Sequence, residues 1–245
     1  MLKPRIIPTL LIRDRGLVKT KRFDAPVYLG DPVNAIKIYN EKEVDELVIL
    51  DIQATKRGSI DWYMLNRLNR EAFMPLGYGG GVKTVTDVEK IINLGYEKVI
   101  INSAFLQTPS LIRECSDLAG SQSIVVCVDV WKDNKGIPKV YDYTRKRTTG
   151  ITPVKYCQLA EEKGAGEIIL HSAEREGTYS GFDRELIAQI AESISIPVIA
   201  LGGASSMDDI YEIFGTGISA AAAGSIFVFY GRLRAVLINY PVIKV

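Results

Sequence analysis

Short apolar runs rich in β-branched residues recur along the chain, separated by longer amphipathic segments. The runs have the length of strands, and the apolar positions between them follow the period of helices. Eight runs are predicted as strands: Arg5–Ile12, Glu46–Asp51, Met74–Tyr78, Lys98–Asn102, Ser123–Val130, Glu167–Ser172, Pro197–Leu201 and Ala220–Gly224. Helices are predicted between them, among others, at Val85–Leu94, Ser110–Ala119, Thr152–Lys163, Arg184–Ser193 and Met207–Phe214. This alternation indicates parallel βαβ units.

The second half of the chain repeats the first. Pro75–Gly81 aligns with Pro197–Gly203, and at the same separation along the chain Ser103–Phe105 aligns with Ser225–Phe227. A four-strand unit that occurs twice closes naturally into eight strands, whereas an open doubly wound sheet gives no reason for such symmetry. We therefore predict an α/β fold, a single (β/α)₈ TIM barrel domain over residues 1–245, with half-barrels of approximately 1–122 and 123–245.

Composition and charge narrow the possible environments and partners. The chain is 47% hydrophobic, and no apolar run reaches the ~20 residues that span a bilayer. The first residues lack the apolar core of a secretory signal, so we expect a cytoplasmic protein without membrane insertion. A net charge of +1 argues against nucleic acid as a partner.

The cysteines suggest neither disulfides nor a metal site. Cys115, Cys127 and Cys157 are odd in number and widely spaced, which fits buried, reduced thiols. No cluster of metal ligands or nucleotide fingerprint stands out. We therefore predict no metal and no cofactor.

Two glycine-rich turns are the clearest candidate binding elements. Gly79–Gly81 and Gly202–Gly203 each follow a predicted strand and precede a helix, where backbone N–H groups approach an anion. The first phosphate seat is predicted to consist of Gly80, Gly81, Asn102 and Ser103, and the second of Gly202, Gly203, Gly224 and Ser225. The alternative is that these glycines only permit tight turns, but two symmetric copies with adjacent serines favour a ligand with two phosphates.

Motifs along nearly the whole chain resemble the cyclase subunit of imidazole glycerol phosphate synthase. They are Arg5–Ile7, Gly30–Pro32, Asp45–Val48, Tyr78–Gly81, Lys98–Asn102, Gly164–Glu167 and Ala223–Ser225. In that family a glutaminase subunit docks on the N-terminal face of the barrel, and ammonia passes through the barrel to a bis-phosphorylated substrate. The resemblance implies the same architecture here, and it adds Gly177 to the phosphate-binding residues. A related barrel isomerase of the same pathway is a weaker match.

The family uses two aspartates as general acid and base, at the ends of strands one and five. Asp129 matches the second, whereas Leu11 stands at the first. Asp14 lies three residues further on, in the following loop, and cannot substitute by simple alternation. General acid–base steps typically accelerate a reaction about 10²–10⁴-fold, so we expect the cyclase reaction to be slowed by a similar factor. Asp129 is then expected to be the solitary inward carboxylate of the pocket.

Further departures indicate a rebuilt site. Glu176, His171 and Leu201 stand where the resemblance leads us to expect Asp, Thr and Ser, whereas Lys19 and Asp51 match. This combination resembles glycosyl-amidation-associated proteins of O-antigen and lipopolysaccharide biosynthesis, which work with a glutaminase homologue and a sugar amidotransferase. Our leading hypothesis is an ammonia-delivering subunit of such an amidotransferase complex. The alternatives are an authentic cyclase, which is a lyase of histidine biosynthesis, and a non-catalytic scaffold that activates the glutaminase.

His171, the only histidine, ends a predicted strand on the ligand face. It is a candidate general acid or base, with Lys19 as a second possible catalytic group. The simpler interpretation, which we prefer, is a polar lining residue that hydrogen-bonds ligand or backbone. Cys127 also points inward, two residues before Asp129, and is interpreted as a packed thiol.

Four charged residues begin predicted strands and point inward at the opposite end of the barrel. They are Arg5, Glu46, Lys98 and Glu167. Two positive and two negative groups can pair in a ring where an isolated charge would be heavily penalised. The resemblance identifies this ring as an ammonia gate, and the alternative is a salt-bridge plug that conducts nothing. The resemblance also makes Glu97, beside Lys98, a candidate contact for the glutaminase, and the alternative is an ordinary solvated carboxylate.

Overall fold

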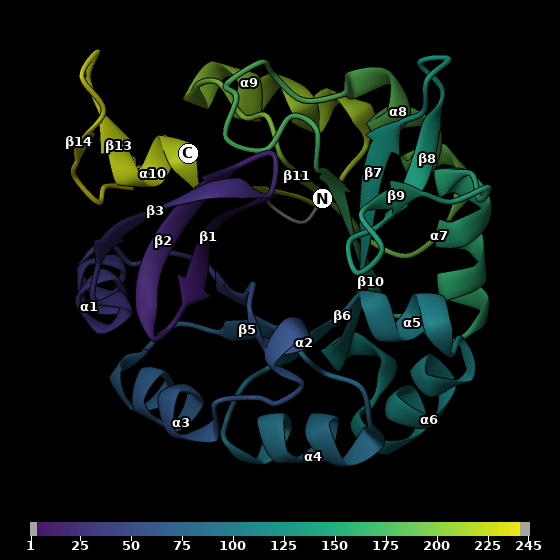
Figure 1. The fold of residues 1–245 in the computed structure, drawn as a ribbon, viewed down its shortest axis with the longest axis horizontal. Coiled ribbons are helices and arrows are strands. Elements are labelled where there is room, and N and C mark those ends of the chain that lie inside the picture. Colours follow the sequence, from purple (N-terminus) through teal and green to yellow (C-terminus); the bar gives the residue numbers. More distant parts are fainter. Residues whose placement is uncertain (1–3, 241–245) are drawn as a thin grey trace.

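Eight parallel strands form a closed barrel in the computed structural model, which describes residues 4–240 (Figure 1). In chain order these are β1 (Arg5–Arg13), β4 (Leu47–Asp51), β5 (Leu76–Gly79), β6 (Lys98–Ile101), β7 (Ile124–Lys132), β10 (Glu167–Ser172), β11 (Val198–Leu201) and β12 (Ala220–Ala223). Strand β12 pairs in parallel with β1, and β10 pairs with both β7 and β11, so the sheet closes on itself. The predicted barrel fold is confirmed.

Helices surround the barrel as an outer ring (Figure 1). The main ones are α1 (Pro32–Glu41), α3 (Trp62–Glu71), α4 (Val85–Asn93), α6 (Ser110–Ala119), α7 (Pro153–Glu162), α8 (Arg184–Ser193) and α9 (Met207–Ile213). Shorter helices are α2 (Ala54–Arg57), α5 (Ser103–Gln107), α10 (Ser225–Val228), η1 (Ser121–Ser123) and η2 (Phe214–Thr216). None of the helices within residues 4–240 has the length and apolar character needed to cross a membrane.

Polar side chains fix where the helices begin after the strands. The Thr84 side chain accepts a hydrogen bond from the backbone N–H of Asp87 at the start of α4, and the Asp87 carboxylate accepts one from the backbone N–H of Thr84. The Ser206 side chain accepts a hydrogen bond from the backbone of Asp209 at the start of α9, and the Asp183 side chain accepts one from Leu186 at the start of α8. Such caps satisfy donors that have no partner inside the helix, so the βα turns adopt defined paths at the end of the barrel that carries the site.

Two antiparallel hairpins rise above the barrel and were not predicted. Strand β1 continues into β2 (Gly16–Lys21) and β3 (Asp24–Gly30), and β7 continues into β8 (Pro138–Asp142) and β9 (Arg147–Thr148). Phe23 at the tip of the first hairpin makes an edge contact with Tyr143 of the second, with ring centroids 5.5 Å apart. The hairpins therefore meet at the mouth of the barrel.

The core has two parts, which follow from the alternation of side chains along each strand. Side chains that face outward pack against the helices, whereas those that face inward fill the barrel axis. The inner cluster consists of Ile7, Val48, Ile100, Val125, Cys127, Ile169, Ile199, Leu201, Ala220 and Ala222, with Leu50 packed against it. This aliphatic layer separates the charged N-terminal end from the polar C-terminal end.

The end of the described chain departs from the helical ring. After α10 the chain forms a small hairpin of β13 (Phe229–Tyr230) and β14 (Ala235–Val236). Tyr240 then packs against Phe227, and its hydroxyl donates a hydrogen bond to the carbonyl of Ile6. The segment is thereby fixed to the first strand of the barrel.

Candidate functional site

A cavity of about 390 Å³ opens at the C-terminal ends of the strands. Its walls include the ends of seven barrel strands, and both hairpins contribute to it through residues such as Lys19, Phe23 and Tyr143. Catalytic sites of TIM barrels lie at this face. The cavity is therefore the candidate site.

The first phosphate seat lies in this cavity, which Gly80, Gly81, Asn102 and Ser103 all line. Gly80 has φ +130°, and a Cβ there would lie 2.5 Å from the Asp51 carbonyl oxygen. Only glycine fits this turn, so the backbone of the seat is available to a ligand. Phosphate binding here stays a prediction.

The second phosphate seat lines a separate, smaller pocket that also contains Gly177. Gly202 has φ +96°, and its Cβ would meet the Ser172 carbonyl oxygen at 2.5 Å. Gly80 and Gly202 thus occupy equivalent turns after β5 and β11. Glu176 lines both this pocket and the main cavity, so one carboxylate borders the two pockets that contain the predicted seats.

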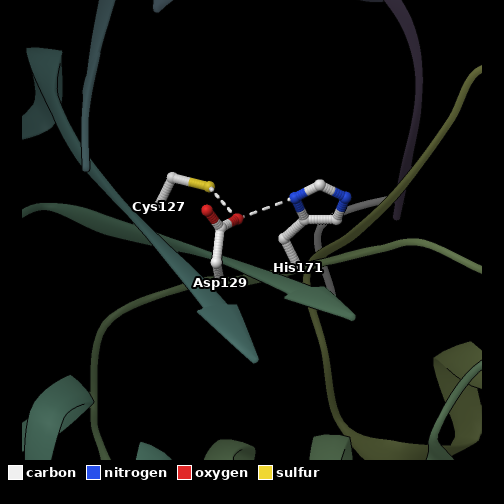
Figure 2. A group of neighbouring side chains, drawn as sticks. All are labelled: Cys127, Asp129 and His171. Carbon is white, nitrogen blue, oxygen red and sulfur yellow. Dashed lines mark hydrogen bonds and ion pairs between the residues drawn. The ribbon is translucent and has the colours of Figure 1, made fainter. Parts of the chain in front are cut away.

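Asp129 is held between two side chains at the centre of the site. It is 4% exposed, and its Oδ2 accepts a hydrogen bond from Asn102 Nδ2 at 2.7 Å. Its Oδ1 lies 2.9 Å from His171 Nδ1 (Figure 2). His171 on β10 is the register partner of Asp129 on β7, so the barrel sheet itself brings the two together.

A row of alternating charges continues from this pair. The second imidazole nitrogen, Nε2, lies 3.6 Å from Glu176 Oε2, and Lys19 Nζ donates to Glu176 Oε1 at 3.2 Å. All four side chains of the row, Asp129, His171, Glu176 and Lys19, are buried. The row is neutral overall when His171 is protonated.

These contacts shift the pKa values of two members of the row. Burial alone would lower the pKa of His171, but the hydrogen bond with Asp129 and the close contacts with Cys127 and Glu176 raise it well above 6.5. Burial would raise the pKa of Glu176, but the charge of Lys19 and the contact with His171 lower it to about 2. The site thus favours the protonated imidazole of His171 and the ionised carboxylate of Glu176 at neutral pH.

His171 is expected to stay protonated at pH values where an ordinary imidazole is neutral. Because its folded pKa lies above the unfolded value, the ion pair stabilises the fold fully below about pH 6.5, and this contribution is lost as pH rises through the folded pKa. As the only histidine, His171 gives a single set of imidazole NMR signals, which a pH titration in metal-free buffer would follow. Asp129→Asn should lower the midpoint, whereas Asp14→Asn should not change it. A wild-type midpoint near 6.5 would contradict the pairing.

The expectation that Asp129 would be a solitary inward carboxylate is wrong. Asp51 and Glu176 line the same cavity. The Asp51 carboxylate accepts hydrogen bonds from the backbone N–H groups of Gln53 and Ala54 and from the Arg57 side chain. The Glu176 carboxylate instead faces His171 and Lys19. Glu176 follows β10 in a loop, and strand alternation alone gave no signal that it would turn inward.

The remaining sequence predictions for this face have mixed outcomes. Leu11 lines the cavity, whereas the Asp14 side chain is 68% exposed and pairs with Arg13, so Asp14 does not replace it. His171 bonds a carboxylate rather than the backbone. Burial raises the pKa of the Cys127 thiol to about 11, as a packed thiol requires.

The four charged residues at the opposite end form the predicted ring. Arg5 donates to Glu46 at 2.5 Å and also to Glu167, and Lys98 donates to Glu46 at 3.2 Å and to Glu167 at 2.5 Å. Both carboxylates are buried. The pairing is thus as expected, while passage of ammonia through the ring stays a prediction. Glu97 beside it is exposed.

Sequence reasoning missed two features of the site. Phe23 and Tyr143 line the cavity, and both lie on the two hairpins that were not predicted from the sequence. Cys127, Asp129 and His171 form a group of possible metal ligands, although no such cluster was visible along the chain. The spacing of two residues between Cys127 and Asp129 was the only available signal, because His171 joins them through strand pairing.

Comparison with known proteins gives one family and several similar relatives. Residues 5–234 match the family described as histidine biosynthesis protein. A Pseudomonas aeruginosa protein provisionally named imidazole glycerol phosphate synthase subunit hisF2 is 49% identical over 243 residues, covering 98% of this chain and 97% of the relative. A Leptospira interrogans protein, provisionally named imidazole glycerol phosphate synthase subunit HisF, is 43% identical, with coverages of 98% and 96%. The imidazole glycerol phosphate synthase subunit HisF of Streptococcus sanguinis is 40% identical, with coverages of 95% and 93%.

Proposed function

Because the chain belongs to the histidine biosynthesis protein family, we propose that it is the cyclase-type, ammonia-accepting barrel subunit of a glutamine-dependent complex. All three relatives described above carry names that refer to imidazole glycerol phosphate synthase. These names favour the cyclase alternative over the surface-sugar hypothesis. The family resemblance is thereby confirmed, whereas the narrower O-antigen offshoot has no support from them.

One observation carries the proposal: a barrel with a charged ring at one end and two glycine turns at the other. The ring of Arg5, Glu46, Lys98 and Glu167 lies where ammonia would enter from a glutaminase bound at the N-terminal face. The glycine turns lie where a ligand with two phosphates would be held at its ends. Between the phosphates, the ligand would meet Asp129 and the charged row.

In this proposal each group has a distinct task. The backbone N–H groups of the two seats position the ligand, and the ammonium group of Lys19 adds positive charge near the second seat, since it lies against Gly224. Asp129 serves as the proton-transferring carboxylate that the family resemblance assigns to its position. Leu11 supplies no proton, so the rate is limited at that step.

A second candidate function rests on Leu11 alone. A barrel without the strand-one acid would deliver ammonia to a sugar amidotransferase and would leave the bis-phosphorylated intermediate unconverted. The two functions separate in one assay, which measures turnover of the histidine-pathway intermediate with ammonium ion. Turnover supports the cyclase proposal. Binding of the intermediate without turnover contradicts it in favour of ammonia delivery.

The second phosphate seat gives a quantitative prediction for the same assay. Gly202→Ala should raise KM about 10–100-fold, the equivalent of the 1.5–3 kcal/mol of a hydrogen bond to a charged group, because the new Cβ displaces the turn from the Ser172 carbonyl. Gly217→Ala is the matched control. It has a similar positive φ of +86°, so it carries the same backbone strain, but no atom lies within 4 Å of its added Cβ. Equal KM values for the two variants would contradict phosphate binding at Gly202.

A further inference from the structure

Three ligand atoms of different chemistry meet beside the cavity (Figure 2). A sulfur of Cys127, a carboxylate oxygen of Asp129 and a ring nitrogen of His171 all lie within 4.8 Å of one another. Each of the three residues is no more than 6% exposed. We propose that these side chains bind one divalent transition-metal ion, with Zn²⁺ as the best match.

The barrel sheet fixes the spacing of the three ligands. Cys127 and Asp129 are two residues apart on β7, so both point inward, and His171 lies opposite Asp129 in the register of β7 and β10. Because hydrogen-bonded strands carry all three, their separation does not depend on loops. Thiolate, imidazole and carboxylate together suit zinc, whereas Ca²⁺ and Mg²⁺ require oxygen ligands.

The surrounding groups orient the ligands as they do around bound metals. Asn102 occupies Oδ2 of Asp129 and leaves Oδ1 directed toward Cys127 and His171. His171 directs Nδ1 into the group, and Nε2 has no hydrogen-bond partner within residues 4–240. The nearest carboxylate to Nε2 is that of Glu176, at 3.6 Å, which Lys19 holds in place. A metal-bound histidine typically donates its other N–H to such a carboxylate.

The cavity provides an open coordination position. All three side chains line it, so a fourth ligand to the ion can come from water or from the bound substrate. The Cys127 sulfur lies 3.9 Å from Asp129 Oδ1, a contact too long to be more than a weak hydrogen bond. On binding, the ion would displace the proton of the Cys127 thiol and the proton on Nδ1 of His171, both of which would pass to solvent through the open cavity, and the sulfur would become a thiolate ligand. The charge of Zn²⁺ would balance one thiolate and one carboxylate.

Metal content tests the proposal without reference to turnover. The tag-free full chain, first stripped with a chelator, is titrated with Zn²⁺ by calorimetry, and we expect one ion per chain. Cys127→Ala and His171→Asn should abolish this binding, and Glu176→Gln should weaken it about 10–100-fold, as loss of an outer partner does. Cys157→Ala removes another buried thiol, on α7, and should bind zinc like the wild type.

Two results of the titration would each overturn the proposal. One is wild-type binding below one ion per two chains at saturating zinc, and the other is unchanged affinity in His171→Asn. Far-ultraviolet circular dichroism establishes that each variant is folded. The NMR signals of the single imidazole must also move at Nδ1 when zinc is added, since an ion bound elsewhere would leave them in place. Cyclase turnover by a wild-type chain that binds no zinc in this titration would refute the metal site and leave the proposed function intact, because that function assigns no task to an ion.

Discussion

Leu11→Asp is expected to raise turnover of the bis-phosphorylated intermediate with ammonium ion by about 10²–10⁴-fold, the usual contribution of a general acid or base. Position 11 ends the inward-facing part of β1, lines the same cavity as Asp129 and is 7% exposed. A carboxylate there would give the ligand a second proton-transferring group. Steady-state kinetics over a range of pH would measure the gain and should show a new ionisation.

The control for this variant is Leu11→Asn. It has nearly the same shape and polarity as aspartate, but it transfers no proton, so its turnover should stay at the wild-type level. Both variants introduce a polar group beside Leu50 and Val18, the register partners of Leu11, and lose a similar amount of stability. An Asp variant that binds the intermediate and gains nothing over the Asn variant would show that proton transfer at this position is not limiting.

Glu167→Ala is expected to lower the free energy of unfolding by about 3–5 kcal/mol, because removal of one partner leaves buried charge uncompensated. Glu167 pairs with both Arg5 and Lys98, so two cations would remain with Glu46 alone. The loss should fall toward the lower end of this range, since the Arg5 side chain is 28% exposed. Denaturant unfolding measures it.

Glu162→Ala is the matched control for the ring. Glu162 also pairs with a lysine, Lys163, but its side chain is 68% exposed, so the cost should be no more than about 1 kcal/mol. Similar losses for the two variants would contradict a buried ring. Glu167→Gln keeps the size of the side chain and permits a functional comparison. If the ring is a gate, this variant should change glutamine-dependent turnover more than turnover with added ammonium ion.

The barrel could be predicted because its signals are local and repeated. Each strand is a short apolar run, and the paired motifs at Pro75 and Pro197 indicated closure. Most predicted strands and helices agree with the structure to within about two residues at each end. The hairpin strands β2 and β3 were missed because neither alternates regularly: four successive residues of β2 are buried, and five successive residues of β3 are exposed.

The site was predicted in its separate parts but not in its connections. The glycine turns and the four ring residues follow from position along a strand, which the sequence displays. The contact of Asp129 with His171 depends on the register between β7 and β10, and that of Glu176 with Lys19 joins a loop to a hairpin. Such contacts arise from tertiary packing, and they leave no periodic pattern along the chain.

The two hairpins rise from β1 and β7, the first strand of each half of the chain, and they meet through Phe23 and Tyr143. The surfaces that contact the middle of a ligand are therefore carried on different segments from the glycine turns that would hold its ends. Exchange of the second hairpin would alter which molecules are accepted while the predicted phosphate contacts persist, because Lys19, which lies against Gly224 of the second seat, is on the first hairpin. A barrel of this kind could therefore come to act on a different molecule while it still binds ligands through their terminal phosphates.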